Sequence, residues 1–275
     1  MWTQQGGSPL KMTLSASLLL LLLLGLAQAV PLQEDEEQEG DPEDESVDIS
    51  SRILNTNNGT YEFLLEGDLL PPSTRNAQKC WGNRCLWDKG QDGLVTIAYS
   101  VNRQFSGGER QLIDNALKSF ESKSCIRFVA RTHQRDYLRI ESQGGCFSSV
   151  GKQGGGQVLS LNRQGCMYRG IVQHEVLHAL GFRHEHNRSD RDQYVRINWQ
   201  NIQPQSAYNF DKQDTNNLGV SYDYGSIMHY GKTAFSIDGY METITPIPNR
   251  HVNIGQRNRL SSLDIQKLNK LYSCY

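Results

Sequence analysis

The sequence predicts an α+β fold, with a sheet and helices in the first half of the chain and mostly irregular backbone in the second. Three observations support this prediction. Several short segments before residue 162 have the apolar pattern of strands, and an apolar repeat of helical spacing follows the first of them. The chain beyond residue 181 is rich in Asn, Asp and Gly until a last helical segment. With 275 residues, the chain is long enough to bury a substantial core.

Each element has its own signal in the sequence. The predicted strands are residues 93–101 (GLVTIAYSV), 125–131 (CIRFVAR), 136–142 (DYLRIES) and 156–162 (GQVLSLN). Residues 106–124 form a predicted helix, because their apolar side chains recur at helical spacing. Residues 144–156 (GGCFSSVGKQGGG) are too rich in glycine for a strand interior and predict a flexible loop at the edge of the sheet. Residues 261–274 predict a terminal helix that Ser261 or Ser262 can cap.

Residues 1–29 have the features of a secretory signal peptide. One Lys precedes an apolar run of about a dozen residues, and the small residues of Ala27-Gln28-Ala29 predict cleavage after Ala29. The run is shorter than the roughly 20 residues that cross a membrane, and no segment downstream comes closer. We therefore expect a secreted protein without a membrane span, translated from either Met1 or Met12.

Residues 30–75 form an acidic leader. They carry 13 acidic and 2 basic side chains, whereas residues 76–275 carry 17 acidic and 25 basic ones. The first part of the leader, residues 31–48, has few large apolar side chains and is expected to be disordered. The leader is either a solvated linker or a segment that lowers the potential of a basic body until it is removed. Arg75 lies in a polar stretch where a trypsin-like protease could cut, and no nucleic-acid-binding motif is present.

All six cysteines lie after residue 75. An even number of cysteines in a secreted chain predicts three disulfides, with fifteen possible pairings. None of the pairs has the C-x-x-C spacing of a zinc knuckle or a redox site. Asn58 and Asn187 each begin an N-glycosylation sequon.

Residues 172–190 (VQHEVLHALGFRHEHNRSD) carry the strongest chemical signal. On a helix, His174 and His178 lie one turn apart and about 40° apart around the axis, so both imidazoles can bind one metal ion. Glu175 is displaced to the side, which suits a general base that takes a proton from water at the metal. This spacing therefore predicts a metal site on a helix, with a base beside it.

A third histidine needs a break in the helix. His184 would point away from the metal if the helix continued, but Gly181 in a left-handed conformation can turn the chain and bring it back. Three neutral histidines with an open fourth position are typical of a catalytic zinc site. The other histidines lack supporting spacing: a structural role is expected for His229, and surface positions are expected for His133, His186 and His251.

The pattern H-E-x-x-H-x-x-G-x-x-H that these residues form resembles the extended zinc signature of the metzincin endopeptidases, and Glu185 after it is the mark of the astacin family. Residues 222–231 (YDYGSIMHYG) are similar to the family's Met-turn. The resemblance covers residues 76–275 and implies a metzincin fold, with a mixed twisted sheet and the active-site helix in the first half and a cleft before the second. It also implies one zinc ion per chain, Met228 as the hydrophobic floor beneath it, and Tyr230 as an extra ligand that also stabilises the oxyanion.

The same resemblance implies an activation scheme. Residues 65–68 are similar to the family's Phe-x-Gly-Asp element, with Leu65 in place of Phe, so Asp68 is expected to bind the zinc in the zymogen. Cleavage after Arg75 would release Asn76 as a new N-terminus that interacts with Glu185. The implied disulfides are Cys125–Cys274, Cys146–Cys166 and Cys80–Cys85. The last pair resembles that of the six-cysteine fish astacins, which include hatching (choriolytic) enzymes and nephrosin.

The predicted organisation is a signal peptide (1–29), an activation pro-segment (30–75) and an astacin-type peptidase domain (76–275). The predicted function is that of a secreted zinc endopeptidase made as a zymogen, with egg-envelope glycoproteins as the expected substrates. A tissue enzyme of the nephrosin kind and a non-catalytic, zinc-containing binding or matrix protein are the two alternatives. We expect a monomer, secreted by way of storage granules and activated by a trypsin-like protease.

Overall fold

The structure is a computed structural model that describes residues 47–71, 85–256 and 258–274. Several predicted features lie outside these residues. They are the signal peptide with its cleavage site at Ala29, most of the acidic run, Arg75, Asn76 and Cys80. The part of the leader that is described, residues 47–71, is called the leader segment below.

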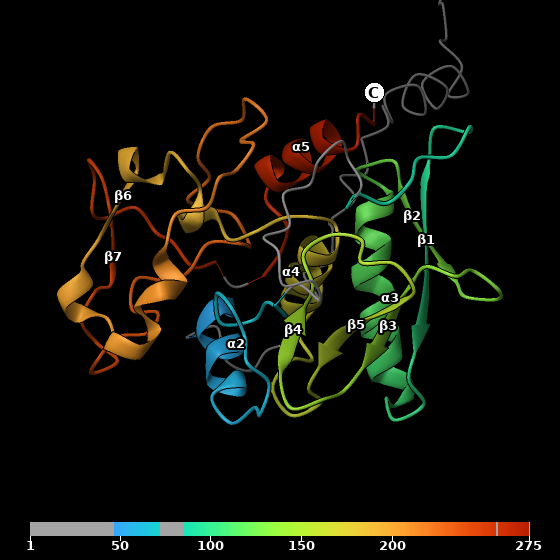
Figure 1. The fold of residues 1–275 in the computed structure, drawn as a ribbon, viewed down its shortest axis with the longest axis horizontal. Helices are drawn as coiled ribbons and strands as arrows, with labels where there is room; N and C mark the ends of the chain where they lie inside the picture. The colour runs from blue at the N-terminus through green and yellow to red at the C-terminus, as the bar shows by residue number, and fades with distance from the viewer. Residues whose placement is uncertain (1–46, 72–84, 257, 275) are drawn as a thin grey trace, which may run out of the picture. The chain divides into compact units, whose positions relative to one another are not determined.

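A five-stranded sheet forms the frame of the first half (Figure 1). Its strands are β1 (Val95–Val101), β2 (Ile126–Ala130), β3 (Tyr137–Glu141), β4 (Cys146–Ser148) and β5 (Gly156–Leu161). Their order is β2-β1-β3-β5-β4, and all neighbours are parallel except β4, which runs antiparallel to β5 at the edge. The prediction of a mixed sheet is confirmed, and each of the four predicted strands is present.

The edge strand β4 corrects one prediction, because it lies within the segment that was expected to be a loop. Its Cys146 and Phe147 side chains are buried, and Cys146 belongs to the main core. The side chain of Asn57 pairs with the backbone of Cys146, accepting from its N–H at 2.7 Å and donating to its carbonyl at 2.7 Å. Contacts from residues 89 positions away therefore order a segment whose glycine content favours a loop.

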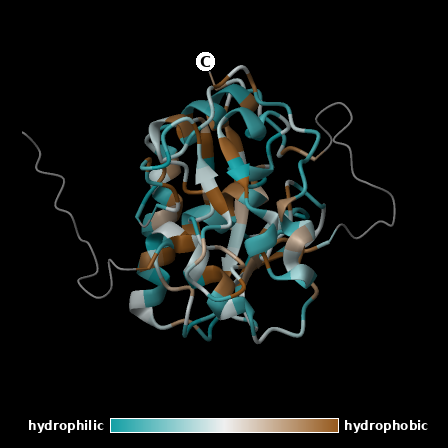
Figure 2. Ribbon diagram, turned by 90° about the vertical axis from the view of Figure 1, so that its left-hand side faces the viewer, coloured by the Kyte–Doolittle hydropathy of each residue, from teal (hydrophilic) through white to brown (hydrophobic). Residues whose placement is uncertain are grey.

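Two helices pack against each other and against the sheet. Helix α3 (Gly107–Glu121) begins at a capping box made by Ser106 and Glu109 and buries one apolar face. Helix α4 (Arg169–Ala179) is buried from Gly170 to its end, polar side chains included. Apolar side chains of both helices and of the strands form one core. In Figure 2 the hydrophobic residues gather in the interior, while outer loops are largely hydrophilic.

The leader segment contains a helix that the sequence did not predict, α2 (Ile49–Asn57). Its N-terminus is capped by Asp48, and the side chains of Ile49 and Ile53 are fully buried in the same core as α4. This helix touches both α4 and β4. The leader segment therefore folds as part of the body, whereas the acidic run that was expected to be a solvated linker lies almost wholly outside the described residues.

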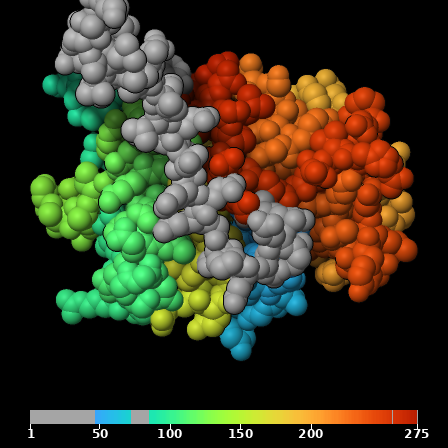
Figure 3. Space-filling view, turned by 180° about the vertical axis from the view of Figure 1, so that it is seen from behind, coloured from blue at the N-terminus to red at the C-terminus, as the bar shows by residue number. Residues whose placement is uncertain are grey.

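The second half has little regular structure, as predicted. Its short 3-10 helices are Glu185–Asn187, Arg191–Gln193, Trp199–Asn201 and Pro204–Phe210. Strands β6 (Val195–Ile197) and β7 (Ile244–Pro246) form an antiparallel pair over a second, smaller core. Helix α5 (Ser262–Leu271) begins at Ser261, which makes a capping box with Asp264. The two halves lie on opposite sides of the molecule in the space-filling view (Figure 3).

The disulfides agree with the implied pairing where they are described. Cys125 is bonded to Cys274, which ties the start of β2 to the end of the chain, and Cys146 is bonded to Cys166. Cys85 is also disulfide-bonded, and its predicted partner Cys80 lies outside the described residues. Among the described residues, no helix is long and apolar enough to cross a membrane.

Gly181 follows the C-cap of helix α4, Leu180, and has a φ of +105°. The Gly181 N–H donates to the His178 carbonyl at 2.8 Å, and the Phe182 N–H donates to the Leu177 carbonyl at 3.0 Å. These two bonds form a Schellman motif, which requires a left-handed residue at this position. The predicted exit from the helix is therefore present.

We predict that Gly181→Ala lowers the free energy of unfolding by about 1–3 kcal/mol, because a side chain disfavours this φ. A steric clash is not the main cause of this loss of stability, because the nearest atom to an added Cβ is Leu86 Cδ2 at 3.3 Å. Gly108→Ala in α3 is the matched control, because no atom lies within 4 Å of its added Cβ. Denaturant titration measures both variants, and equal stability of the two would contradict the role of the turn.

Candidate metal centre

Three histidines converge at one buried point between the two halves. His174 and His178 come from α4, and His184 follows the turn at Gly181. With Asp68 of the leader segment, their ligand atoms all lie within 4.8 Å of one another. All four side chains are buried, with His178 and Asp68 exposed by 0% and 1%. The structure thus brings together the residues that the sequence predicted as zinc ligands of a zymogen.

Hydrogen bonds on the far side of each ring fix the orientation of the histidines. His174 Nδ1 lies 2.8 Å from the Ile227 carbonyl, and His178 Nδ1 lies 2.8 Å from the Phe182 carbonyl. His184 Nδ1 lies 3.0 Å from Glu66 Oε2. Because a carbonyl or carboxylate can only accept, each Nδ1 carries the proton and each Nε2 presents a lone pair.

The distances between the ligand atoms fit a tetrahedral zinc ion. Two Nε2 atoms, of His174 and His178, are 3.1 Å apart with no proton between them, a contact that is repulsive unless both bind a cation. Zinc–nitrogen distances of about 2.0–2.1 Å in a tetrahedron place ligand atoms about 3.3 Å apart. The carboxylate of Asp68 lies 3.0, 3.4 and 3.2 Å from the Nε2 atoms of His174, His178 and His184. The residues present therefore fit zinc.

A tight turn aims Asp68 at this point. Leu65 and Leu69 exchange two backbone hydrogen bonds of 2.8 Å. Within this turn, Glu66 and Gly67 have φ values of +48° and +77°. The Asp68 carbonyl then accepts from the Ser148 N–H at 3.1 Å, on the edge strand β4. Burial alone would raise the pKa of Asp68, but its electrostatic and hydrogen-bond contacts with the histidines, His184 first, hold it well below its usual value.

Glu175 is the most unusual charged group of the site. Its side chain is fully buried, and neither carboxylate oxygen has a hydrogen-bond partner among the described residues. Burial raises the pKa of Glu175 well above its usual value, and the negative charge of Asp68 raises it further. A buried carboxylate without a partner is costly to the fold, which is typical of a group kept for chemistry.

The Met-turn lies beneath the site, and α5 fixes its position. Asp264 accepts from the Ser226 hydroxyl at 2.6 Å and from the Ile227 N–H at 3.0 Å. The Ile227 carbonyl in turn holds His174. Met228 is buried in the main core.

Tyr230 packs against the third histidine without belonging to the ligand group. Its ring centroid lies 4.7 Å from that of His184. Its hydroxyl donates to the backbone carbonyl of Glu66. In this form of the protein, the leader segment therefore binds the group that the resemblance assigns as an extra ligand.

Glu185 lies in a buried cluster behind the metal centre. Its carboxylate accepts from Lys267 Nζ at 2.5 Å, from Arg188 Nη1 at 3.0 Å and from the Asp223 N–H at 2.8 Å. Its predicted partner, Asn76, lies outside the described residues. The sequence did not predict Lys267 of helix α5 as a partner of Glu185. The two residues are 82 positions apart, and only the tertiary structure buries this lysine beside Glu185.

Two predictions beside the site are wrong. His186 was expected on the surface, but it is fully buried against Tyr230 and Phe210, and burial lowers its pKa well below the usual value. Asn187 was predicted as a glycosylation site, but it is also fully buried, and its amide donates to the carbonyls of Asn209 and Asp211 at 2.9 and 2.8 Å. The fold leaves no room for a glycan on Asn187.

The remaining histidines and the first sequon fit their predicted positions. His133 and His251 are exposed, whereas His229 is buried and bonded to the Tyr222 hydroxyl at 2.7 Å. Asn58 is exposed in the turn after α2 and stays a predicted glycosylation site.

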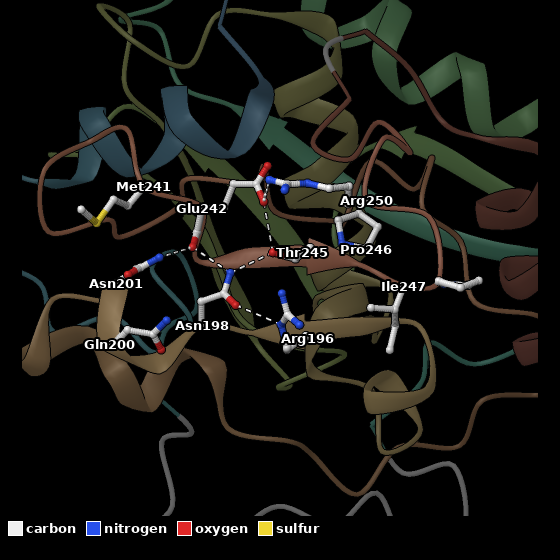
Figure 4. Close-up of a pocket in the computed structure, with 11 residues that line it drawn as sticks. Arg196, Asn198, Gln200, Asn201, Met241, Glu242, Thr245, Pro246, Ile247 and Arg250 are labelled. Atoms are coloured by element: carbon white, nitrogen blue, oxygen red, sulfur yellow. Dashed lines mark hydrogen bonds and ion pairs between the residues drawn. The ribbon is translucent and has the colours of Figure 1, made fainter.

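A cavity of about 490 Å³ lies elsewhere, beside β6 and β7 (Figure 4). Asn198 lines this cavity, and its amide donates to the Glu242 carbonyl at 2.9 Å and to Thr245 Oγ1 at 2.8 Å. Arg196 and Arg250 line it as well. None of the four residues of the ligand group lines this cavity.

The fold and the site together define a class of protein. A mixed sheet, a helix that carries two histidines and a buried glutamate, and a third histidine after a glycine turn are the features of a zinc metalloendopeptidase of the metzincin type. The family profile "Astacin (Peptidase family M12A)" matches residues 85–273. The chain belongs to the astacin family.

Individual relatives agree with this assignment. The chain is 57% identical over 231 residues to high choriolytic enzyme 1 of Oryzias latipes, covering 84% of this chain and 86% of that protein. It is 53% identical over 234 residues to the low choriolytic enzyme of the same fish, covering 84% and 86%. The solved structure of high choriolytic enzyme 1, a hatching enzyme zinc-protease, matches with a TM-score of 0.70 at 57% identity and covers 73% of this chain and 100% of its own. This chain is thus an extracellular protease that acts on proteins.

Two residues of the site were missed in the sequence. Glu66 contacts His184 and Arg183, and its carbonyl holds Tyr230. The signal that could have found Glu66 is its place inside the four-residue element that ends at Asp68. Arg183 stands directly before the third histidine, but its spacing carries no metal-binding pattern.

We predict that His178→Ala removes the zinc ion, which wild-type protein holds at one per chain, because the site loses one of three convergent nitrogens. His186→Gln is the matched control, since this histidine is equally buried and close by but lies outside the ligand group. Zinc content of the purified folded proteins, measured by mass spectrometry, checks this. Retention of zinc by His178→Ala, or its loss from His186→Gln, would contradict the assignment of ligands.

Proposed function

We propose that this zinc endopeptidase is a hatching (choriolytic) enzyme, made as a zymogen and released to cleave egg-envelope glycoproteins. The observation that carries the proposal is 57% identity over 84% of the chain to the high choriolytic enzymes of a fish. The site supports catalysis over the alternative of a structural zinc protein, because Glu175 is buried beside the ligands and has no hydrogen-bond partner among the described residues.

Glu175 is the general base in this proposal. Bound zinc supplies a Lewis acid that polarises the scissile carbonyl and acidifies water. The carboxylate of Glu175 takes a proton from the attacking water, and its raised pKa suits it to pass that proton on to the leaving amine. Once the Glu66 carbonyl is removed, the Tyr230 hydroxyl is free to donate to the oxyanion. The edge of β4 at Ser148, which the leader segment uses here, offers backbone groups to an extended substrate.

The leader segment accounts for latency. Its Asp68 fills the fourth ligand position, and its turn covers the site. The proposed boundaries are a signal peptide over 1–29, a pro-segment over 30–75 and the peptidase domain over 76–275, with activation by a trypsin-like protease after Arg75. The new N-terminus at Asn76 would then join the buried cluster of Glu185, where Lys267 already supplies a positive charge. Storage in granules before release fits an enzyme kept inactive in this way.

We predict that Glu175→Gln in the activated enzyme keeps zinc and fold but lowers kcat by about 10²–10⁴-fold, the usual contribution of a general base. The amide has the same shape and cannot accept the proton. Cleavage of casein by stopped assay and zinc content by mass spectrometry check this prediction. Turnover within a few-fold of wild type would remove Glu175 from the base role.

We predict that Asp68→Ala gives the uncleaved protein partial activity, because the substitution empties the fourth ligand position and removes the contacts of Asp68 with the three histidines, so that the leader segment leaves the site more readily. Asp48→Asn, at the cap of α2, is the control, since it leaves the Asp68 carboxylate in place. Casein cleavage is measured on protein whose intact mass is confirmed before and after the assay. A fully latent Asp68→Ala protein that folds and holds zinc would argue against this mode of inhibition.

The proposed substrate is tested on egg envelopes. Activated protein is incubated with isolated envelopes, with and without 1,10-phenanthroline, beside the Glu175→Gln variant. We expect swelling or dissolution of the envelope with wild-type protein alone, together with expression in hatching-gland cells. Cleavage of casein without any effect on envelopes would support a tissue enzyme of the nephrosin kind instead.

A further inference from the structure

We propose that Trp87 and Tyr272 are positioning residues of the zinc site. Each donates one side-chain hydrogen bond to a buried backbone carbonyl at the end of helix α4, between the second and the third zinc ligand. These two donors, called the clamp below, set the path of the chain from His178 to His184 and thereby the affinity of the site for zinc. The proposal concerns the zinc site itself and does not depend on which protein is the substrate.

The end of helix α4 leaves two carbonyls that the backbone does not pair. The last carbonyls of any helix lack a partner within the helix. The carbonyl of His178 still accepts from the N–H groups of Gly181 and Gly151, both at 2.8 Å. The next two carbonyls, of Ala179 and Leu180, accept from no backbone N–H among the described residues. Because both residues are fully buried, these two carbonyls need side-chain donors.

The clamp supplies one donor to each of these carbonyls. Trp87 Nε1 donates to the Ala179 carbonyl at 2.9 Å, and the Tyr272 hydroxyl donates to the Leu180 carbonyl at 3.0 Å. Both hydrogen bonds are buried, and each joins residues 92 positions apart, one toward the start and one toward the end of the chain. A buried carbonyl that loses its donor stays unpaired or turns toward water, and either change costs free energy.

The two peptide groups that the clamp holds control the geometry of two zinc ligands. Residues 179–183 form the whole connection from His178 to His184, with the turn at Gly181 in its middle. The same connection carries the Phe182 carbonyl, which lies 2.8 Å from His178 Nδ1. A shift of this connection would therefore displace the third ligand and release the second from its acceptor. Groups that orient metal ligands in this way contribute to metal affinity.

The two sides of the clamp are also fastened to each other and to the rest of the fold. Lys89 Nζ donates to the Tyr272 carbonyl at 3.3 Å, so the segment that carries Trp87 contacts the segment that carries Tyr272. Trp87 stands two residues after Cys85, and Tyr272 stands two residues before Cys274. Both cysteines are disulfide-bonded. The donors are thus held in place before zinc binds, which is what a positioning role requires.

The test removes each donor and keeps an aromatic ring in its place. Trp87→Phe and Tyr272→Phe still fill the core but cannot donate to the carbonyls. Tyr99→Phe is the matched control, because it loses a hydroxyl that donates to Asp114 Oδ1 at 2.9 Å, away from the zinc ligands. The measured quantity is the zinc dissociation constant of the activated enzyme, obtained by competition with a chromophoric chelator.

We expect each clamp variant to raise the zinc dissociation constant about tenfold, the lower end of the effect of groups that orient metal ligands. The Tyr99→Phe control keeps the wild-type value. When Co²⁺ replaces zinc, we expect the visible absorption spectrum to shift in both clamp variants and to stay unchanged in the control. Circular dichroism confirms that each variant is folded, and denaturant titration of the zinc-free proteins gives the free energy of unfolding of each.

Two results would overturn the proposal. One is a zinc dissociation constant within about twofold of wild type in either clamp variant, which would leave Trp87 or Tyr272 a role in stability alone. The other is a rise of the same size in Tyr99→Phe, which would assign the effect to general loss of stability. Failure of the wild-type enzyme to dissolve egg envelopes would instead overturn only the hatching role.

Discussion

The convergence of three imidazole nitrogens on one buried point is the constraint on which the rest of the structure depends. The Nε2 atoms of His174 and His178 are 3.1 Å apart, and their lone pairs repel unless they bind a shared cation. Each ring must therefore be held in place by a hydrogen bond at its Nδ1. The acceptors that hold them come from three separate places: the turn after α4, the Met-turn and the leader segment. The site therefore exists only when both halves of the chain and their connection at Gly181 are in place.

The second half of the chain serves this constraint despite its lack of regular structure. Asp264 takes part in the capping box of helix α5 and also accepts from Ser226 and Ile227. The carbonyl of Ile227 is the acceptor that holds His174. The disulfide between Cys125 and Cys274 fastens the end of that helix to the sheet. Irregular backbone can be as well fixed as a helix when its N–H and carbonyl groups are paired in this way. Much of the order in this half comes from side chains that accept from backbone N–H groups.

The leader segment solves a problem of buried charge. Glu66 and Asp68 bring two carboxylates into a dry site, and each is matched by positive or polar partners of the peptidase body. The body then has an unbalanced charge when the segment leaves, at the metal centre and at Arg183. The proposed activation removes these tethered acids and opens the site to water and substrate.

The sequence by itself determined the fold class, the three zinc-binding histidines and the place where the active-site helix ends. These follow from local rules: strand and helix periodicity, the angle between residues four apart, and the freedom of glycine at Gly181. Only the tertiary structure decided which side chains are buried and what they touch. His186 and Asn187 follow directly after the zinc motif, yet contacts with Phe210 and Asn209 bury them. Helix α2 and strand β4 likewise form because residues far apart in sequence pair with them. The contacts of Glu66 came only from the tertiary structure, because its partners His184 and Arg183 lie 118 and 117 residues away.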